Sequence, residues 1–198
     1  MTTEPSLADV GYILEETPKT WFLTISRRAC GLLNEYAVQS QFYNVQPIAN
    51  LPIDPESNLD NYQGSTKCSD VPKHQAIYSG MRIVLTKNLN KEVGYVNGMA
   101  AEVLGMDKQA VLVRTQQGRV ISIYPWTSEE RWTYYPFRLG YASTLHKVQG
   151  ATLEHVTIWL DIANMPAAAY VALSRVQHDK DWRFVGDPGV HHFTPARM

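Results

Sequence analysis

The chain has 198 residues, of which 44% are hydrophobic and 19% charged, and this composition excludes a disordered protein. No apolar run reaches the length of about 18 residues that a membrane-spanning helix needs. With two cysteines and no basic and then apolar leader at the start, the sequence predicts an intracellular protein without a disulfide framework.

The charge is unevenly distributed, although the formal net charge is only −1. Residues 1–70 carry a net charge of −5, residues 71–150 carry +5 and residues 151–198 carry −1. A basic middle is compatible with a polyanion contact, and ordinary surface variation explains it equally well. A net charge so close to zero argues against a protein that simply coats nucleic acid.

The first predicted unit combines a strand with a helix. A β-rich apolar run predicts a strand over residues 20–25, Ser26 is a suitable N-cap, and apolar spacings of three and four predict a helix over residues 27–39. This order indicates an α/β unit. Residues 44–75 are rich in Pro, Asn and Ser, so we expect a long loop there.

In the middle of the chain the pattern changes to short strands. The sequence predicts strands over residues 81–86, 99–104, 110–115 and 119–124, with turn signals between them. Several short strands at this spacing indicate a small β-barrel or an SH3-like module.

After residue 135 the α/β pattern returns. Strands are predicted over residues 139–144, 156–160 and 182–185, and a helix is predicted from Pro166 to Leu173. The tail beyond residue 189 is expected to be loose. Its two adjacent histidines have no spaced ligating partner, so we predict no metal site.

Two segments have residues suited to contacts with phosphate. Thr144, His146 and Lys147 can donate to phosphate oxygens, and Gly150 allows a phosphate to approach the backbone closely. A plain polar turn between two elements is the alternative. Arg175 lies at the end of an apolar helical face, where it either snorkels to water or reaches a phosphoryl group in a cleft.

Together these segments resemble the motifs of a known family. Residues 144–153 resemble motif V of superfamily 1 helicases and residues 170–176 resemble motif VI, in the variant of the Pif1-like branch, which is related to RecD-type helicases. Residues 21–34 resemble motif IV and its helix, and residues 80–98 resemble the segment that leads into the SH3-like 2B insertion. The resemblance covers roughly residues 20–186.

The resemblance implies a fold and an activity. The fold class is α/β, with a RecA-like domain 2A formed by residues 1–79 and 136–198 and interrupted by an SH3-like β-module at residues 80–135. The activity is that of the C-terminal part of an ATP-dependent DNA helicase with 5′→3′ polarity. Roles in DNA repair, recombination and telomere maintenance are implied as well, with a location in the nucleus, a mitochondrion or the bacterial or phage-infected cytoplasm.

The resemblance also implies roles for single residues. Arg175 matches the arginine finger of motif VI, which contacts the γ-phosphate of ATP. Cofactor contacts are implied at Gln149, Gly150 and either Arg27 or Arg28. Contacts with the backbone of single-stranded DNA are implied at Thr144, His146 and Lys147.

The nucleotide-binding half of such a helicase is not found in the sequence. No Gly is followed by Lys, so there is no phosphate-binding loop, and Ile162 follows Asp161 where a helicase would place a catalytic Glu. We therefore interpret Asp161 as a strand-end carboxylate. We expect ATP and Mg²⁺ to be held by a Walker A-containing RecA-like domain in cis or trans, with single-stranded DNA as the other partner and no membrane contact.

Two other functions remain open. The chain is alternatively a truncated, non-catalytic module that binds DNA or a protein. A stand-alone hydrolase that uses His146 is a third alternative, but no G-x-S-x-G sequence accompanies it.

Overall fold

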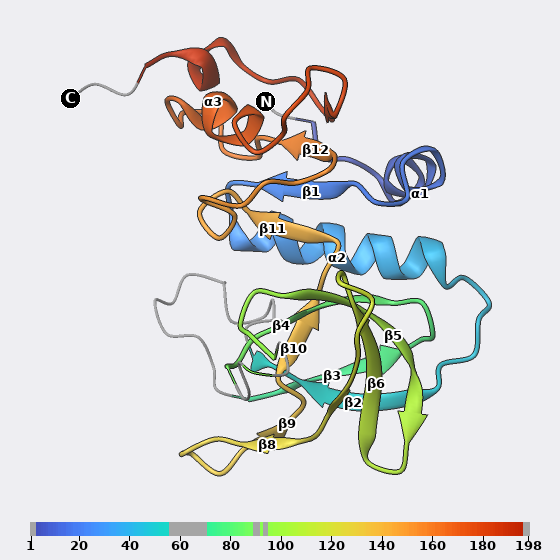
Figure 1. Ribbon diagram of the computed structural model, residues 1–198. Helices are drawn as coiled ribbons and strands as arrows, with labels where there is room; N and C mark the ends of the chain where they lie inside the picture. Colours follow the sequence, from blue (N-terminus) through green and yellow to red (C-terminus); the bar gives the residue numbers. More distant parts are fainter. Residues whose placement is uncertain (1–2, 56–70, 89–91, 93–94, 196–198) are drawn as a thin grey trace. The chain divides into compact units, whose positions relative to one another are not determined.

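The computed structural model describes residues 3–55, 71–88, 92 and 95–195 (Figure 1). The chain divides into two compact units. Unit 1 comprises the residues up to Gln41 and those from Tyr141 onward, and unit 2 is Phe42–Gly140. This division groups residues 42–79 with the β-module, whereas the sequence assigns them to the RecA-like domain. The predicted domain boundaries stay a prediction.

Unit 1 is built on a parallel sheet. Its strands are β1 (Trp21–Thr24), β11 (Ala142–Thr144), β12 (Val156–Trp159) and β13 (Trp182–Phe184), in the order β11-β1-β12-β13, and every neighbouring pair is parallel. All four residues of β12 are buried, as is typical of a central parallel strand covered on both faces. The strands predicted over residues 20–25, 156–160 and 182–185 are confirmed.

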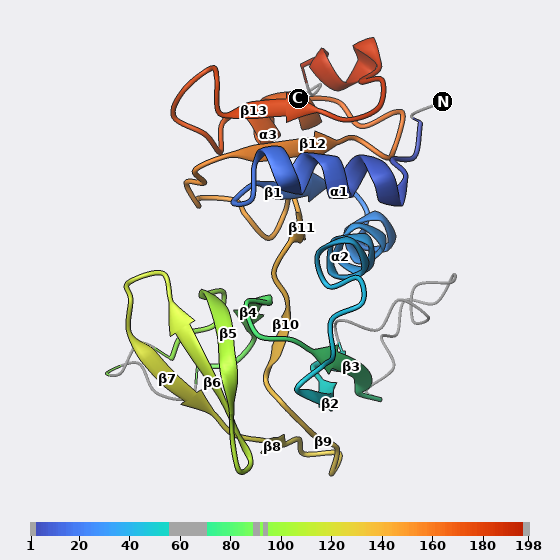
Figure 2. The same cartoon turned by 90° about the vertical axis from the view of Figure 1, so that its right-hand side faces the viewer.

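Two packed helices lie beside this sheet (Figure 2). Helix α2 (Arg27–Gln41) begins where the sequence predicts, and the Ser26 hydroxyl caps it by accepting from the Ala29 N–H at 3.0 Å. Helix α1 (Leu7–Glu16) packs against α2 and was not predicted. It begins with a capping box in which Ser6 and Asp9 each accept from the other's backbone N–H.

The last part of unit 1 contains a short helix and an ordered tail. Helix α3 (Ala168–Leu173) starts two residues after Pro166, and the 3₁₀ helix η3 (Val190–Phe193) packs against it. His192 is completely buried, and its Nε2 lies 2.6 Å from the Ile162 carbonyl oxygen. The prediction of a loose tail is therefore wrong for residues 190–193, because this histidine anchors the segment.

Unit 2 contains an antiparallel sheet. Its strands are β4 (Arg82–Leu85), β5 (Ala100–Asp107), β6 (Ala110–Thr115), β7 (Val120–Ile123) and β10 (Phe137–Leu139), in the order β10-β4-β5-β6-β7. The four strands predicted over residues 81–124 are confirmed. Along the chain, two strands of two residues each, β8 (Trp126–Thr127) and β9 (Thr133–Tyr134), come between β7 and β10 and pair with one another.

The long loop predicted over residues 44–75 is wrong in part. Strand β2 (Ala49–Ile53) pairs antiparallel with β3 (Lys73–Ile77), and Ile53 and Ile77 are fully buried. Residues 56–70 of that prediction lie outside the described residues. The pairing was not evident from the sequence because β2 contains Pro52, which argues against a strand, and β3 begins with three polar residues.

The strand predicted over residues 139–144 is divided between the two units. Strand β10 ends at Leu139 and pairs with β4, whereas β11 begins at Ala142 and pairs with β1. Gly140 lies at the break, where an added Cβ would be 2.8 Å from the backbone carbon of Ile83. In the part of the chain that the structure describes, no helix is both long and apolar enough to cross a bilayer.

Candidate functional site

The carboxyl ends of β1 and β11 lie side by side and lead into most of the candidate residues. Thr24 is the register partner of Thr144, and the Leu145 N–H donates to the Thr24 carbonyl oxygen at 2.9 Å. The chain continues from β1 into Arg27 and Arg28, and from β11 into residues 145–151. Open parallel sheets bind ligands at this edge, so the fold brings motif IV and motif V together where a ligand is expected.

The connection between β1 and α2 is held by Asp161, which follows β12. Its Oδ1 accepts from the Ile25 N–H at 2.8 Å and from the Ser26 N–H at 3.2 Å. These contacts confirm the interpretation of Asp161 as a strand-end carboxylate. Arg27 and Arg28 occupy the first turn of α2 and are both exposed, so the structure does not decide between them.

In the turn after β11, two apolar residues face the core and the polar residues between and after them are exposed. Leu145 and Val148 are each 7% exposed and belong to the core cluster of unit 1. His146, Lys147 and Gln149 are exposed, as is Gly150, whose φ of +82° is readily available only to glycine. Thr144 is buried at 7% exposure, so of the three predicted DNA-contacting side chains only those of His146 and Lys147 reach the surface.

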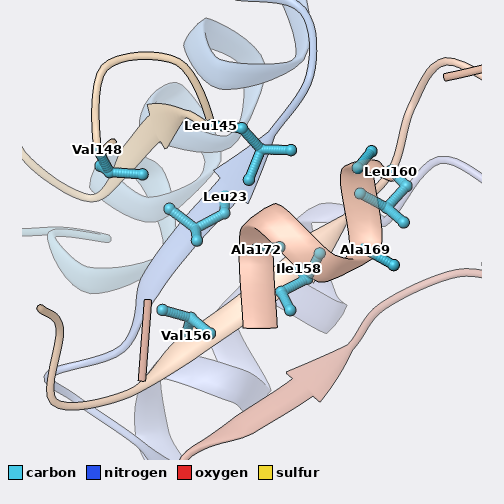
Figure 3. Packing of buried hydrophobic residues seen from close by; sticks show 9 residues of the cluster. Leu23, Leu145, Val148, Val156, Ile158, Leu160, Ala169 and Ala172 are labelled. Atoms are coloured by element: carbon cyan, nitrogen blue, oxygen red, sulfur yellow. The ribbon is translucent and has the colours of Figure 1, made fainter. Parts of the chain in front are cut away.

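The same core cluster joins this turn to α3. Figure 3 shows Leu145 and Val148 beside Leu23 of β1, with Ala169 and Ala172 of α3 over β12. The small alanine side chains allow the short helix to lie close to the sheet. The placement of α3 therefore depends on packing with the turn and with the central strands.

Arg175 follows α3 and connects it to the turn. Its Nη1 donates to the Val148 carbonyl oxygen at 3.3 Å, its Nε to the Val171 carbonyl oxygen at 3.2 Å, and its Nη2 to the Ser174 hydroxyl at 2.7 Å. The Arg175 carbonyl oxygen accepts from the Leu153 N–H at 2.8 Å. The guanidinium is half-buried, and these bonds leave N–H groups on Nη1 and Nη2 that meet no acceptor among the described residues.

Sequence reasoning assigned no role to Asn34, which holds the start of β11. Its Oδ1 accepts from the N–H groups of Tyr141 and Ala142, each at 3.0 Å, and its Nδ2 donates to the carbonyl oxygens of Ala142 and Cys30 at 3.3 and 3.0 Å. Asn34 is 7% exposed. The sequence contained one signal for this role: Asn34 is a polar residue between Leu33 and Ala37 on the apolar face of the helix. An amide side chain buried in this way is normally hydrogen-bonded.

A second polar cluster lies at the amino ends of the strands. His155 Nδ1 lies 2.7 Å from the Thr20 hydroxyl, which is 2.9 Å from the Thr157 hydroxyl. Burial lowers the pKa of His155, the positive charge of Arg183 lowers it further, and Asp181 acts in the opposite direction. This cluster is at the edge of the sheet opposite to the candidate site. Across the described ranges, no group of three or more His, Cys, Asp or Glu is placed to hold a metal ion.

Comparison with known proteins gives one consistent result, although no family model matches the chain. The ATP-dependent DNA helicase Pif1 of Bdellovibrio bacteriovorus is 29% identical over 146 residues, which is 64% of this chain and 33% of that protein. Human ATP-dependent DNA helicase PIF1 is 30% identical over 134 residues, 58% of this chain and 21% of that protein. The resemblance to Pif1-like helicases is confirmed. The chain spans a third or less of the length of these two relatives.

Solved Pif1 structures agree with the fold. Pif1 from Bacteroides in complex with ADP-AlF3 and single-stranded DNA matches with a TM-score of 0.65 at 20% identity, over 99% of this chain and 52% of that one. Pif1 from Candida albicans matches with a TM-score of 0.65 at 19% identity, over 93% of this chain and 48% of that one. The predicted α/β, RecA-like fold is confirmed.

Proposed function

We propose that the chain acts as the C-terminal part of an ATP-dependent 5′→3′ DNA helicase, in which Arg175 is the arginine finger and the turn after β11 contacts single-stranded DNA. One observation supports this most directly: the Arg175 guanidinium lies 3.3 Å from the backbone of the turn that carries His146 and Lys147. In this arrangement, the guanidinium proposed to contact the γ-phosphate of ATP and the side chains proposed to contact DNA belong to the same packed unit. The curated relatives, which are ATP-dependent DNA helicases, also support the proposal.

On the nucleotide side, we propose that Arg175 meets the γ-phosphate, with Gln149, Gly150 and Arg27 or Arg28 nearby. Both arginines are exposed in the first turn of α2, and a guanidinium group suits a contact with phosphate oxygens. The residues described here do not fit Mg²⁺, because both oxygens of Asp161 already accept from backbone N–H groups and no group of three or more His, Cys, Asp or Glu in the described ranges is placed to hold a metal ion. ATP and Mg²⁺ are therefore assigned to a Walker A-containing RecA-like domain, supplied in cis or in trans.

On the DNA side, we propose that His146 and Lys147 contact the phosphate backbone. Both side chains are exposed. Thr144 takes part through its backbone, since its side chain is buried. The antiparallel sheet of unit 2 supports an SH3-like module between the two parts of a 2A domain, with the predicted boundaries at residues 80–135.

The cellular context is part of the same proposal and rests on the resemblance alone. It comprises roles in DNA repair, recombination and telomere maintenance. It also comprises an intracellular location, in the nucleus, a mitochondrion or the cytoplasm.

An ATPase assay with and without an added Pif1-like first domain tests the nucleotide side. We expect the chain alone to bind ATP weakly without turnover, and the reconstituted pair to hydrolyse ATP when single-stranded DNA is present. Replacing Arg175 by Ala should then reduce turnover roughly 10³- to 10⁵-fold. The exposed Lys180→Ala variant, which removes one charge elsewhere on unit 1, is the control. Turnover by the isolated chain that Arg175→Ala abolishes would contradict the need for a partner domain.

A binding titration with labelled single-stranded DNA tests the DNA side. We expect weak binding whose affinity falls with rising salt concentration, because contacts with DNA phosphates gain much of their free energy from the release of counterions. The affinity should be lower still in Lys147→Ala, which loses one such contact. The Lys180→Ala control should bind as the unaltered chain does. An affinity that responds neither to salt nor to Lys147→Ala refutes the assignment.

The alternative of a non-catalytic binding module is separated by the same reconstitution. If no added Walker A domain restores turnover while DNA binding persists, the module hypothesis is favoured. The hydrolase alternative lacks an activated nucleophile: within the described part of the chain, the His146 side chain makes no hydrogen bond. The Ser174 hydroxyl is occupied by Arg175 and the Val171 carbonyl oxygen.

A further inference from the structure

We infer that Arg175 is also a positioning residue for the turn that carries His146 and Lys147, before any nucleotide binds. The inference deepens the proposed function and rests on it for the meaning of that turn. An arginine finger in the simple sense needs only to reach a phosphate. In this structure the same residue makes two contacts with the segment after β11, one through its side chain and one through its backbone.

The two contacts fix the middle and the end of the segment. Arg175 Nη1 donates to the Val148 carbonyl oxygen at 3.3 Å, which also accepts from the Ala151 N–H at 3.0 Å. The Arg175 carbonyl oxygen holds the Leu153 N–H at 2.8 Å, just before β12 begins. Residues 151–153 form no helix or strand, so these bonds replace the regular pairing that would otherwise hold them.

The shape of the guanidinium makes the contact specific to arginine. Its Nε faces the Val171 carbonyl oxygen at 3.2 Å and its Nη2 faces the Ser174 hydroxyl at 2.7 Å. With two corners of a rigid planar fork held by the end of α3, the third corner is directed at Val148. A lysine ammonium carries the same charge but has no fixed fork, so it cannot hold these three acceptors in one plane.

The arrangement has a consequence for coupling. The N–H groups on Nη1 and Nη2 that remain free can meet a phosphate while Nη1 still donates to the Val148 carbonyl oxygen, and hydrogen bonds between two charged groups are roughly twice as strong as neutral ones. A phosphate bound there fixes the guanidinium, and through it the turn. By thermodynamic reciprocity, DNA that orders the turn must change the phosphate affinity by the same factor.

Amide hydrogen exchange in the full chain, without nucleotide, tests the positioning role. In Arg175→Ala we expect the amide of Ala151 to exchange at least about tenfold faster, because the Val148 carbonyl oxygen to which it donates loses a charged donor that holds the turn. The amide of Leu153 keeps its acceptor, the backbone carbonyl oxygen of residue 175, and should change less. Arg175→Lys should not rescue the Ala151 amide. The amide of Leu33 in α2 should be unchanged, which separates local loosening from global destabilisation. Lys180→Ala is the charge control and should leave all three amides unchanged.

The outcomes separate this inference from the proposed function. Unchanged exchange at Ala151 in Arg175→Ala, or full rescue by Arg175→Lys, overturns the positioning role whatever the DNA affinity. Faster exchange together with weaker DNA binding in both Arg175 variants supports the inference and the function. Faster exchange with DNA binding that neither Arg175→Ala nor Lys147→Ala alters supports the positioning role and refutes the DNA contact.

Discussion

Replacing Asn34 by Ala tests how the strand that leads into the candidate site is held. The amide side chain makes four hydrogen bonds to backbone groups, three of them to the start of β11. Tyr141 and Ala142 are completely buried, so their N–H groups lose an acceptor that water does not readily replace. At about 1 kcal/mol for each neutral bond, with more for a buried donor left without its acceptor, we expect a loss of about 3 kcal/mol.

The readout must be local to unit 1 because the chain has two compact units. Native-state hydrogen exchange at the buried amides of Phe22 and Ile158 reports the free energy of unfolding of that unit. Gln39→Ala, at an exposed position on the same helix, should stay within about 0.5 kcal/mol of the unaltered chain. A loss below about 1 kcal/mol for Asn34→Ala would show that the side chain does not hold β11.

Three further predictions concern stability. The pKa of His155 is lowered in the folded state, so the unfolded chain binds more protons than the folded chain. The free energy of unfolding should therefore fall as the pH drops from about 7 through the folded-state pKa. Chemical denaturation at a series of pH values should show this fall, and His155→Gln should make the pH dependence flatter. Ser26→Ala removes the cap of α2 and should cost about 1 kcal/mol by urea denaturation, and a change near zero would contradict the capping role. Gly140→Ala forces a methyl group against the Ile83 backbone and should cost about 1–3 kcal/mol, whereas Gly105→Ala has open space and should cost less; equal losses would refute the steric argument.

The sequence alone determined the elements whose causes are local. The β-rich run before Ser26, the cap itself and the apolar spacing after it are enough to predict β1 and α2. The hairpin of β6 and β7 follows from two apolar runs around Gly118. The resemblance of residues 144–153 and 170–176 to helicase motifs is likewise a property of short segments, and the similarity of the chain to Pif1 helicases agrees with it.

Only the tertiary structure decided how these segments are joined. The run of residues 139–144 is divided at Gly140, which packs against the backbone of Ile83. The tail is ordered by the contact of His192 with the carbonyl oxygen of Ile162. The hydrogen bond between Arg175 and Val148 joins residues that are 27 positions apart. Apolar periodicity and capping are set by residues within a few positions of one another, so a sequence displays them directly. Contacts between distant residues form only when the whole unit is folded, and the same side chain is a surface arginine or a structural bridge according to what the fold brings to it.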